Sequence, residues 1–396
     1  MRVIISECLL GIPCRYDGKA KPKTAVQQLA EKVEVVGVCP ETASGLKVPR
    51  PPAEQRSGRV YLKDGSDVTQ AFELGAERSL KKVHKQPAPL AVLKAKSPSC
   101  GVHHIYDGSF TGTLVEGWGI FARQLQKEGI CVVSEEVVEA CKPSVEHPVA
   151  IILGTGLGHI TQLVHPVRRI DYHDIEGFPE AARPIPGHSF EAIVGSIEDV
   201  PVVVYPGRIH LYQGYSAAEV SALVRHAHNL GCRDIIFACA TGAVEGNAEL
   251  GLGIVSDQIN LTGRNPLAEW DELREVDTPF VDMSDAYSPY LRTLAKSVAE
   301  DEGLKVQEGV LAGVLGPCSE TRTEAKLLAQ LGVSYVGMST VNEVIMARAL
   351  GMNVLGLTLA TNYSGSHTVS HKNVLAEAKR KEEEFQKLVL GTLRLL

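Results

Sequence analysis

Hydrophobic positions gather in short runs that are rich in β-branched residues and bounded by polar or turn-forming residues. Such runs predict buried strands, because branched side chains pack well on extended backbone. They lie at residues 1–8, 33–38, 90–93, 149–153, 202–205, 234–237 and 354–357. Between the runs, apolar residues recur at helical spacing. The helices that this spacing predicts cover residues 69–83, 216–230, 323–331 and 339–350, with a charged, solvated helix over 377–387.

The alternation of strands and helices predicts an α/β fold. The clearest domain boundary lies near residues 140–148, where Pro143, Pro148 and mixed polar residues precede a new apolar run. We therefore expect a smaller N-terminal α/β domain with cysteine loops over 1–143. Residues 149–396 are expected to form a second domain with a central mixed sheet flanked by helices. A length of 396 residues suits two domains of typical size.

Composition narrows the function classes. The net charge of -7 argues against a nucleic-acid-coating protein, whose affinity would come from clustered Lys and Arg. No segment reaches the roughly 18–20 apolar residues that span a bilayer. The apolar start of the chain passes into Gly11 and Pro13 without a signal-peptide cleavage region, so we expect a cytoplasmic enzyme of small molecules.

Cysteines are unevenly distributed along the chain. Of nine in total, six fall before the predicted boundary, namely Cys8, Cys14, Cys39, Cys100, Cys131 and Cys141. In a chain without a secretion signal, they indicate thiols or metal ligands rather than a disulfide framework. The asymmetry predicts cysteine chemistry in the N-terminal domain.

An ordered series of motifs runs through the C-terminal two thirds of the chain. Its members are residues 151–158 (Ile-Ile-Leu-Gly-Thr-Gly-Leu-Gly), 186–188, 206–215, 260–267, 316–321 (Gly-Pro-Cys-Ser-Glu-Thr), 336–340, 361–362 and His371. Each fragment alone is weak, because Gly-Pro marks a turn and a loop Asn or His usually caps or packs something. As a series, it resembles the trimeric type of purine nucleoside phosphorylase. The resemblance implies a homotrimeric pentosyltransferase whose neighbouring subunit closes the active site.

Phosphorolysis moves a ribosyl group from a base to phosphate, so the site must hold an anion below the sugar and stabilise the departing base. The resemblance assigns phosphate, the co-substrate, to one set of residues. These are Thr155, His188, Arg208, Thr241 and Ser339, with the backbone around Ala240. A planar guanidinium suits a phosphate, and the glycine-rich loop at 154–158 would let amide groups approach it.

The same resemblance places Glu320 and Asn362 in the purine pocket. A carboxylate can accept the N1 proton of a 6-oxopurine, while the Asn amide can hydrogen-bond N7 and favour departure. The remaining residues implied around the sugar are Met338 under the ribose, Tyr212 on a ribose hydroxyl, His371 on the 5′-hydroxyl and His210 near the ribose–phosphate junction. We expect Asn362, Glu320 and His210 to be the catalytic residues.

The chain departs from the family pattern in the base pocket. Ser319, beside Cys318, stands where the family commonly has an aromatic residue before the base-reading Glu. Loss of a stacking ring would weaken base affinity by about 0.5–1.5 kcal/mol. Gln213 occupies a position where many members carry Glu, and Cys239 precedes Ala240. A softer, sulfur-lined pocket could admit a thiopurine.

Two alternatives remain open for this domain. Methylthioadenosine phosphorylases typically show Gly-Pro-Arg-Phe and an Asp at the base position. This chain instead has Gly-Pro-Cys-Ser-Glu at 316–320 and Asn362, which fit a 6-oxo or similar base better than an adenine. A nucleoside-binding sensor with a structural cysteine domain is the other alternative. A sensor has no need for Arg208, His188 and Ser339 together, so the phosphate residues favour an enzyme.

The N-terminal domain carries a second constellation. Its motifs are residues 6–11, 14–18, 38–41, 49–54 and 97–101. Thiolates gathered from separate loops suit a soft metal or an iron–sulfur cluster, and the spacing is not the Cys-x-x-Cys pair of a zinc ribbon. The segment resembles a family of small domains that includes thiouracil desulfidases, enzymes that remove sulfur from a thiolated base with a [4Fe-4S] cluster.

That second resemblance implies three cluster ligands, Cys8, Cys39 and Cys100, with one iron left open for the substrate's sulfur. Glu41 and Ser99 are the implied candidates for proton transfer. Cys14 could be either a ligand or a packing thiol. We expect the two domains to serve related substrates, one releasing a base from its nucleoside and the other removing sulfur from a thiolated base or nucleoside.

Overall fold

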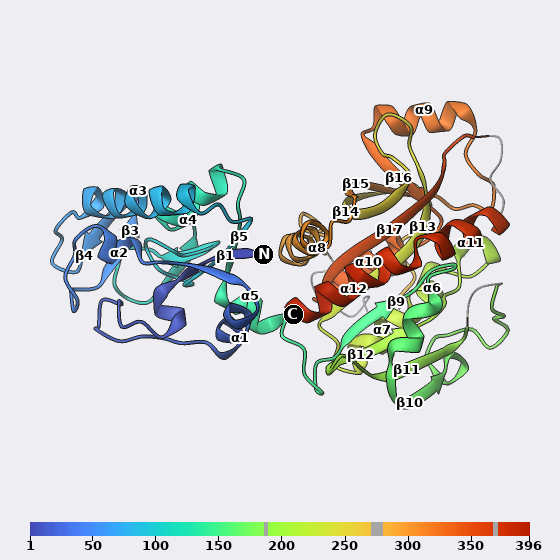
Figure 1. Ribbon diagram of the computed structural model, residues 1–396, viewed down its shortest axis with the longest axis horizontal. Coiled ribbons are helices and arrows are strands. Elements are labelled where there is room, and N and C mark those ends of the chain that lie inside the picture. The colour runs from blue at the N-terminus through green and yellow to red at the C-terminus, as the bar shows by residue number, and fades with distance from the viewer. Residues whose placement is uncertain (186–188, 271–279, 367–370) are drawn as a thin grey trace. The chain divides into compact units, whose positions relative to one another are not determined.

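The computed structural model describes residues 1–185, 189–270, 280–366 and 371–396, with side chains from residue 375 onward in the last range (Figure 1). The chain divides into two compact units. One is Met1–Lys142, to which Leu395–Leu396 are assigned, and the other is Pro143–Arg394. No helix in the described ranges combines the length and apolar character needed to cross a membrane.

The N-terminal unit is built on a four-stranded parallel sheet in the order β2-β1-β5-β8. Its strands are β1 (Arg2–Ser6), β2 (Glu34–Val38), β5 (Leu90–Leu93) and β8 (Cys131–Ser134). The helices are α1 (Thr24–Lys32), α2 (Pro40–Ala43), α3 (Thr69–Lys85), α4 (Ile120–Lys127) and α5 (Glu135–Ala140). Figure 1 shows α3 and α4 on one face of this sheet and α1 and α5 on the other. Both faces are thus covered, which explains why β5 is apolar throughout.

Two short hairpins and a 3-10 turn complete this unit. The hairpins are β3 (Ala53–Arg56) with β4 (Arg59–Leu62) and β6 (His104–Tyr106) with β7 (Leu114–Glu116). The turn η1 (Glu7–Leu10) begins directly after β1 and carries Cys8. Cys39 directly follows β2 and precedes α2. The carboxyl ends of the parallel strands therefore present cysteines at one edge of the sheet.

The C-terminal unit contains a nine-stranded mixed sheet in the order β10-β11-β12-β9-β13-β16-β15-β14-β17. Its strands are β9 (Val149–Ile152), β10 (His165–Asp171), β11 (Glu191–Ile197), β12 (Val200–Tyr205), β13 (Asp234–Ala243), β14 (Gly251–Asn260), β15 (Val306–Gly313), β16 (Val333–Gly337) and β17 (Asn353–Tyr363). Strand β13 also pairs with β17, so the strands from β13 to β17 close into a ring. Strands β9, β12, β13 and β17 run parallel, and their carboxyl ends share one edge.

Helices flank this sheet and supply the rest of its core. They are α6 (Ala217–Val220), α7 (Ala222–Asn229), α8 (Pro289–Asp301), α9 (Arg322–Gln330), α10 (Val341–Ala349), α11 (His371–Arg380) and α12 (Glu382–Leu395). Phe237 of β13, Leu223 of α7 and Val344 of α10 belong to one continuous buried cluster. The mixed sheet with flanking helices, beside a smaller α/β unit, confirms the fold class predicted from the sequence.

Two predicted helices differ from the structure. The segment 216–230 forms two helices rather than one, and they meet at Ser221, whose φ of -90° and ψ of 3° depart from helical values. The buried Ser221 hydroxyl donates to the carbonyl of Ala217 at 2.8 Å, a bond of the kind that bends helices. The charged segment 377–387 spans the break between α11 and α12. Phe385 in that segment is buried, so its face is not simply solvated as predicted.

Candidate active sites

The shared edge of the C-terminal sheet gathers most of the predicted nucleoside and phosphate residues. Thr155 follows β9, Arg208 follows β12, and Ala240 and Thr241 lie near the end of β13. Gly154, which precedes Thr155, lies so close to β13 that a Cβ there would stand 2.8 Å from the Ala238 oxygen. A glycine is therefore required where the loop after β9 crosses β13. The parallel strands place these segments side by side.

Strands β16 and β17 bring further predicted residues to this edge. Asn362 pairs in register with Gly242 of β13. At the end of β16, a Cβ on Gly337 would stand 3.3 Å from the Thr241 methyl group. Met338 and Ser339 follow Gly337 directly, so they leave the sheet beside Thr241. The structure thus brings the base-side and phosphate-side residues of the sequence analysis into one region.

Arg208 is almost wholly buried and bound to several protein groups. One guanidinium nitrogen, Nη1, donates to both carboxylate oxygens of Glu343, at 3.2 and 3.0 Å. The other, Nη2, donates to the carbonyls of Ile152 at 3.0 Å and Ala238 at 2.7 Å. The sequence analysis treated Arg208 only as a phosphate ligand. In the structure its guanidinium joins the end of β9 to the middle of β13.

Thr340, which links Ser339 to α10, is held by Arg208 and Glu343. Thr340, the residue before α10, has a φ of 78° and accepts from Arg208 Nη1 at 3.3 Å through its hydroxyl. Its amide donates to Glu343 at 2.6 Å. A non-glycine residue with positive φ is uncommon and needs such support from its surroundings. The Ser339 hydroxyl lies 3.4 Å from that of Thr340, so the proposed phosphate contact stands next to a tightly fixed residue.

The predicted base-binding residues lie on two segments that meet. The Ser364 hydroxyl donates to Oε2 of Glu320 at 2.7 Å. Asn362, two residues earlier, accepts from the Thr361 hydroxyl at 3.1 Å and donates to the Tyr363 carbonyl at 3.3 Å. Glu320 and Asn362 are therefore joined through a three-residue stretch of β17 and the turn that follows it.

His210 and Tyr212 form a stacked pair with ring centroids 4.7 Å apart. The His210 amide donates to the side-chain oxygen of Gln213 at 2.9 Å, which fixes the turn between the two rings. Burial raises the pKa of the Tyr212 phenol, so this group stays protonated and can donate a hydrogen bond at neutral pH. His188 lies outside the described residues, as does the side chain of His371.

A cavity of about 500 Å³ opens in the N-terminal unit. Its lining includes four cysteines from four separate segments, Cys8, Cys14, Cys39 and Cys100. The structure thus unites the three predicted ligands and adds Cys14, whose role the sequence left open. Glu41 and Ser99 line the same cavity.

The four thiols influence one another. The pKa of Cys14 is lowered by a hydrogen bond with the Cys39 thiol and raised by one with the Cys8 thiol. Burial raises it further, and the pKa that results from all these effects is about 12. Contact with the Cys14 thiol, followed by burial, raises the pKa of Cys39 well above its usual range. Burial raises the pKa of Cys100 to about 12. All three are thiols at neutral pH in this state of the protein.

Cysteine thiolates are the ligands of iron–sulfur clusters, so a lining that carries four cysteines supplies donors of the right type for such a group. Among the described residues, no three His, Cys, Asp or Glu side chains are spaced to share a single metal ion. The fit therefore rests on donor type and on the shared cavity.

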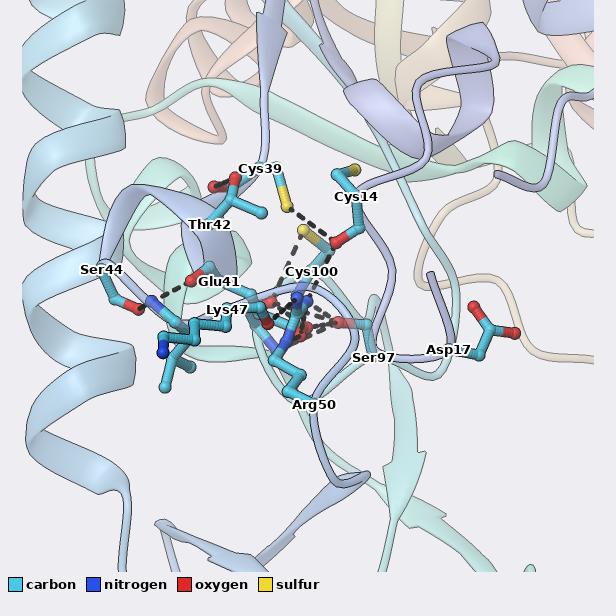
Figure 2. Close-up of polar contacts among 12 residues, drawn as sticks. Cys14, Asp17, Cys39, Glu41, Thr42, Ser44, Lys47, Arg50, Ser97 and Cys100 are labelled. Carbon is cyan, nitrogen blue, oxygen red and sulfur yellow. Dashed lines mark hydrogen bonds and ion pairs between the residues drawn. The ribbon is translucent and has the colours of Figure 1, made fainter. Parts of the chain in front are cut away.

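Glu41 is the centre of a polar network in this cavity (Figure 2). Its Oε1 accepts from the Ser99 hydroxyl at 3.1 Å, and the Ser99 hydroxyl is also 3.9 Å from the Cys100 sulfur. Its Oε2 accepts from Nε of Arg50 at 3.0 Å and from Nη2 of the same side chain. Arg50 Nη2 also donates to the Cys14 carbonyl at 3.1 Å. The network connects the predicted proton-transfer pair with the cysteine loops.

Three residues of these networks were missed by the sequence analysis, namely Glu343, Ser364 and Arg50. Thr340 and Glu343 do show the T-x-x-E spacing of a capping box, which the structure forms. That spacing predicts a helix start, but it does not predict that Glu343 also binds Arg208. Arg50 stood within a noted motif, 49–54, without a role. Ser364 lies beyond the last strand motif and gave no signal.

Comparisons with known proteins agree with this division. Residues 148–394 match the family model described as the phosphorylase superfamily, and residues 3–137 match that of 2-thiouracil desulfurase. Purine nucleoside phosphorylase 1 of Geobacillus stearothermophilus is 38% identical over 250 residues, covering 62% of this chain and 90% of that protein. The purine nucleoside phosphorylase of Mycobacterium tuberculosis is 39% identical over 238 residues, covering 58% of this chain and 83% of that protein.

A solved structure gives the same result. The crystal structure of Schistosoma mansoni purine nucleoside phosphorylase in complex with adenosine aligns with a TM-score of 0.58 and 32% identity. The alignment covers 69% of this chain and 94% of that chain. Both resemblances stated from the sequence are confirmed as family matches.

Proposed function

The chain belongs to the phosphorylase superfamily through residues 148–394, and from this we propose that it is an enzyme that cleaves purine nucleosides with phosphate, giving free base and ribose 1-phosphate. The observation that carries the proposal is the set of relatives of known activity, which align with nearly the whole C-terminal unit. The gathering of Arg208, Thr241 and Asn362 at one sheet edge supports it.

We assign the residues as follows. Thr155, His188, Thr241 and Ser339 hold the phosphate together with Arg208 and the backbone at Ala240, and Met338, Tyr212, His371 and His210 hold the ribose. Asn362 stabilises negative charge that develops at N7 as the glycosidic bond breaks, while Glu320 accepts the N1 proton of the base. The phosphate oxygen forms a bond to the anomeric carbon as the purine nitrogen leaves with the electron pair.

Product analysis tests this assignment. Inosine, guanosine, adenosine, 6-thioguanosine and methylthioadenosine are each incubated with the full chain, with and without phosphate, and the free base and the sugar 1-phosphate are quantified. Release of both products only with phosphate is the expected result. Nucleoside binding without cleavage would favour the sensor, and cleavage confined to methylthioadenosine would favour that branch of the family.

We propose a second activity for the N-terminal unit, the removal of sulfur from a thiolated base or nucleoside. The specific observation in its favour is the cavity lined by four cysteines next to the Glu41–Ser99 pair. A [4Fe-4S] cluster held by Cys8, Cys39 and Cys100 would supply an iron that binds the sulfur. Ser99 and Glu41 would move the protons of the attacking water. In the net reaction, water supplies the oxygen that replaces sulfur, which leaves as hydrogen sulfide without a change of oxidation state.

Anaerobic reconstitution with iron and sulfide tests the second activity. We expect bound iron, visible absorbance, and sulfide release from 2-thiouracil or 6-thioguanosine. Cys8→Ser, Cys39→Ser and Cys100→Ser should each lose bound iron, while Cys131→Ser, which changes a cysteine outside the cavity lining, should keep it. Equal iron binding by all four variants would contradict the ligand assignment.

Two further properties belong to this proposal. We expect a homotrimer whose neighbouring subunit closes the site, as the resemblance to the trimeric type of purine nucleoside phosphorylase implies, and light scattering at defined concentration measures the mass of the assembly. We also propose that the enzyme acts in the cytoplasm.

A further inference from the structure

Ser364 binds the carboxylate that we assign to base recognition. Its hydroxyl donates to Oε2 of Glu320 at 2.7 Å, and the residue is only 8% exposed. The Ser364 amide donates to the Ala243 carbonyl at 2.8 Å, so the pairing of β17 with β13 extends as far as this residue. Ser364 is therefore fixed by the sheet, and its contact with Glu320 has a rigid origin.

The neighbouring Gly365 explains how the two segments come so close. It has a φ of 73°, and a Cβ at this position would lie 3.0 Å from the Ala325 methyl carbon and 3.2 Å from the Arg322 Cα. Both contacts belong to the first turns of α9, which begins two residues after Glu320. The missing side chain lets the end of β17 rest against α9, and this approach brings the Ser364 hydroxyl to the carboxylate.

The hydrogen bond has a chemical consequence for the base. A donor on Oε2 stabilises the ionised carboxylate, which is an acceptor only. The carboxylate can accept from the N1–H of a 6-oxopurine or a 6-thiopurine. Adenine presents a lone pair at N1, so the same carboxylate repels it and leaves a polar group unpaired.

We propose that Ser364 is a positioning residue that selects bases carrying a proton on N1. Asn362, assigned to N7, precedes it by two residues on the same paired segment, so one stretch of β17 would fix both contacts with the base. The inference rests on the proposed role of Glu320. It adds a residue that lies outside every motif used to identify the site.

Steady-state kinetics of the full chain test the inference with Ser364→Ala and Ser364→Thr. We expect S364A to lower kcat/KM for inosine about tenfold, mainly through KM, because a hydrogen bond to a charged group is lost. Cleavage of adenosine should change less than about twofold, and S364T, which keeps the hydroxyl, should recover most of the inosine activity. Where adenosine turnover is too slow to measure, the ratio of the inhibition constants of hypoxanthine and adenine reports the same preference for a base with a proton on N1.

Two reference variants keep failures distinguishable. Ser297→Ala removes another buried hydroxyl, on α8, for which the described residues provide no hydrogen-bond partner, and it should leave both constants unchanged. Glu320→Gln should lower the preference for inosine and hypoxanthine. If E320Q leaves that preference intact, the proposed role of Glu320 fails. The role of Ser364 is overturned if E320Q lowers the preference for inosine over adenosine but S364A leaves that preference intact. It is also overturned if S364A lowers kcat/KM for inosine and for adenosine equally.

Discussion

Arg208 and Glu343 form an ion pair with 3.0 Å between Nη1 and Oε2, and neither side chain is exposed to solvent. Arg208 also donates to the carbonyls of Ile152 and Ala238, while Glu343 accepts from the amide of Thr340. The pair therefore fastens β9 and β13 to the start of α10. These are the segments that carry the proposed phosphate ligands, so the buried charge pair holds together the backbone of the proposed phosphate site.

Loss of the carboxylate should destabilise the protein strongly. In Glu343→Ala the Arg208 guanidinium stays buried without its counter-charge, which typically costs about 3–5 kcal/mol. We expect this loss in the free energy of unfolding measured with urea, together with a raised KM for phosphate. The control is Glu383→Ala, because Glu383 is 84% exposed and forms only a surface pair with Lys387. An unfolding curve of E343A that matches the control would contradict the structural role.

Asn362 should affect the chemical step rather than phosphate binding. If its amide stabilises charge at N7 only as the bond breaks, Asn362→Ala should lower kcat for inosine by about 10²–10³-fold. The KM for phosphate should stay within about twofold, because the residue is assigned to the base side. Asn229→Ala changes an exposed amide at the end of α7 and serves as the control. A rise in KM with unchanged kcat would instead indicate uniform substrate binding.

Much of the fold was predictable because strand and helix periodicities are local. The run at 90–93 coincides with β5, and the two compact units divide after Lys142. The break at Ser221 was not predictable, since the apolar spacing continues through it. Ring closure between β13 and β17 is likewise a long-range pairing that no local pattern encodes.

For the candidate site, the sequence predicted only residues that lie within the ordered series of motifs. Arg208, Glu320 and Asn362 were proposed as site residues from their neighbours in sequence. Their partners depend on contacts across the chain, because Glu343 lies 135 positions after Arg208 and Ser364 lies 44 positions after Glu320. Because such contacts arise from tertiary packing, a single sequence offers no sign of them.

Stability in alkali should report the burial of Cys232. Burial, followed by the nearby Asp234 charge, raises the pKa of the Cys232 thiol from its ordinary value of 9.0 to about 12. A raised pKa contributes stability that is complete below about pH 9 and is lost as the pH rises toward 12. The free energy of unfolding should therefore fall less steeply with pH in Cys232→Ala than in the wild type. The two slopes should differ by up to about 1.4 kcal/mol per pH unit. Urea unfolding at pH 9, 10 and 11 measures the slopes. Cys318→Ala, which changes an exposed thiol, should keep the wild-type slope.

Arg50 should be needed for the proposed removal of sulfur. Its guanidinium joins Glu41 Oε2 to the Cys14 carbonyl, and the side chains of Arg50 and Glu41 are only 8% and 16% exposed. In Arg50→Gln the carboxylate loses both the positive charge and the donors that orient it toward Ser99. We expect sulfide release from the reconstituted protein to fall at least about tenfold while bound iron is unchanged.

Arg50→Lys separates charge from geometry at this position. A single ammonium keeps the charge but cannot reproduce the planar fork that reaches Glu41 and Cys14 together, so we expect an intermediate rate of sulfide release. Arg59→Gln is the matched control, because Arg59 is 64% exposed and pairs with Asp67 at the surface. Sulfide release at the wild-type rate in R50Q would contradict the role of Arg50. If R59Q lost as much activity as R50Q, the effect would reflect general loss of charge, and orientation of Glu41 would not be its cause.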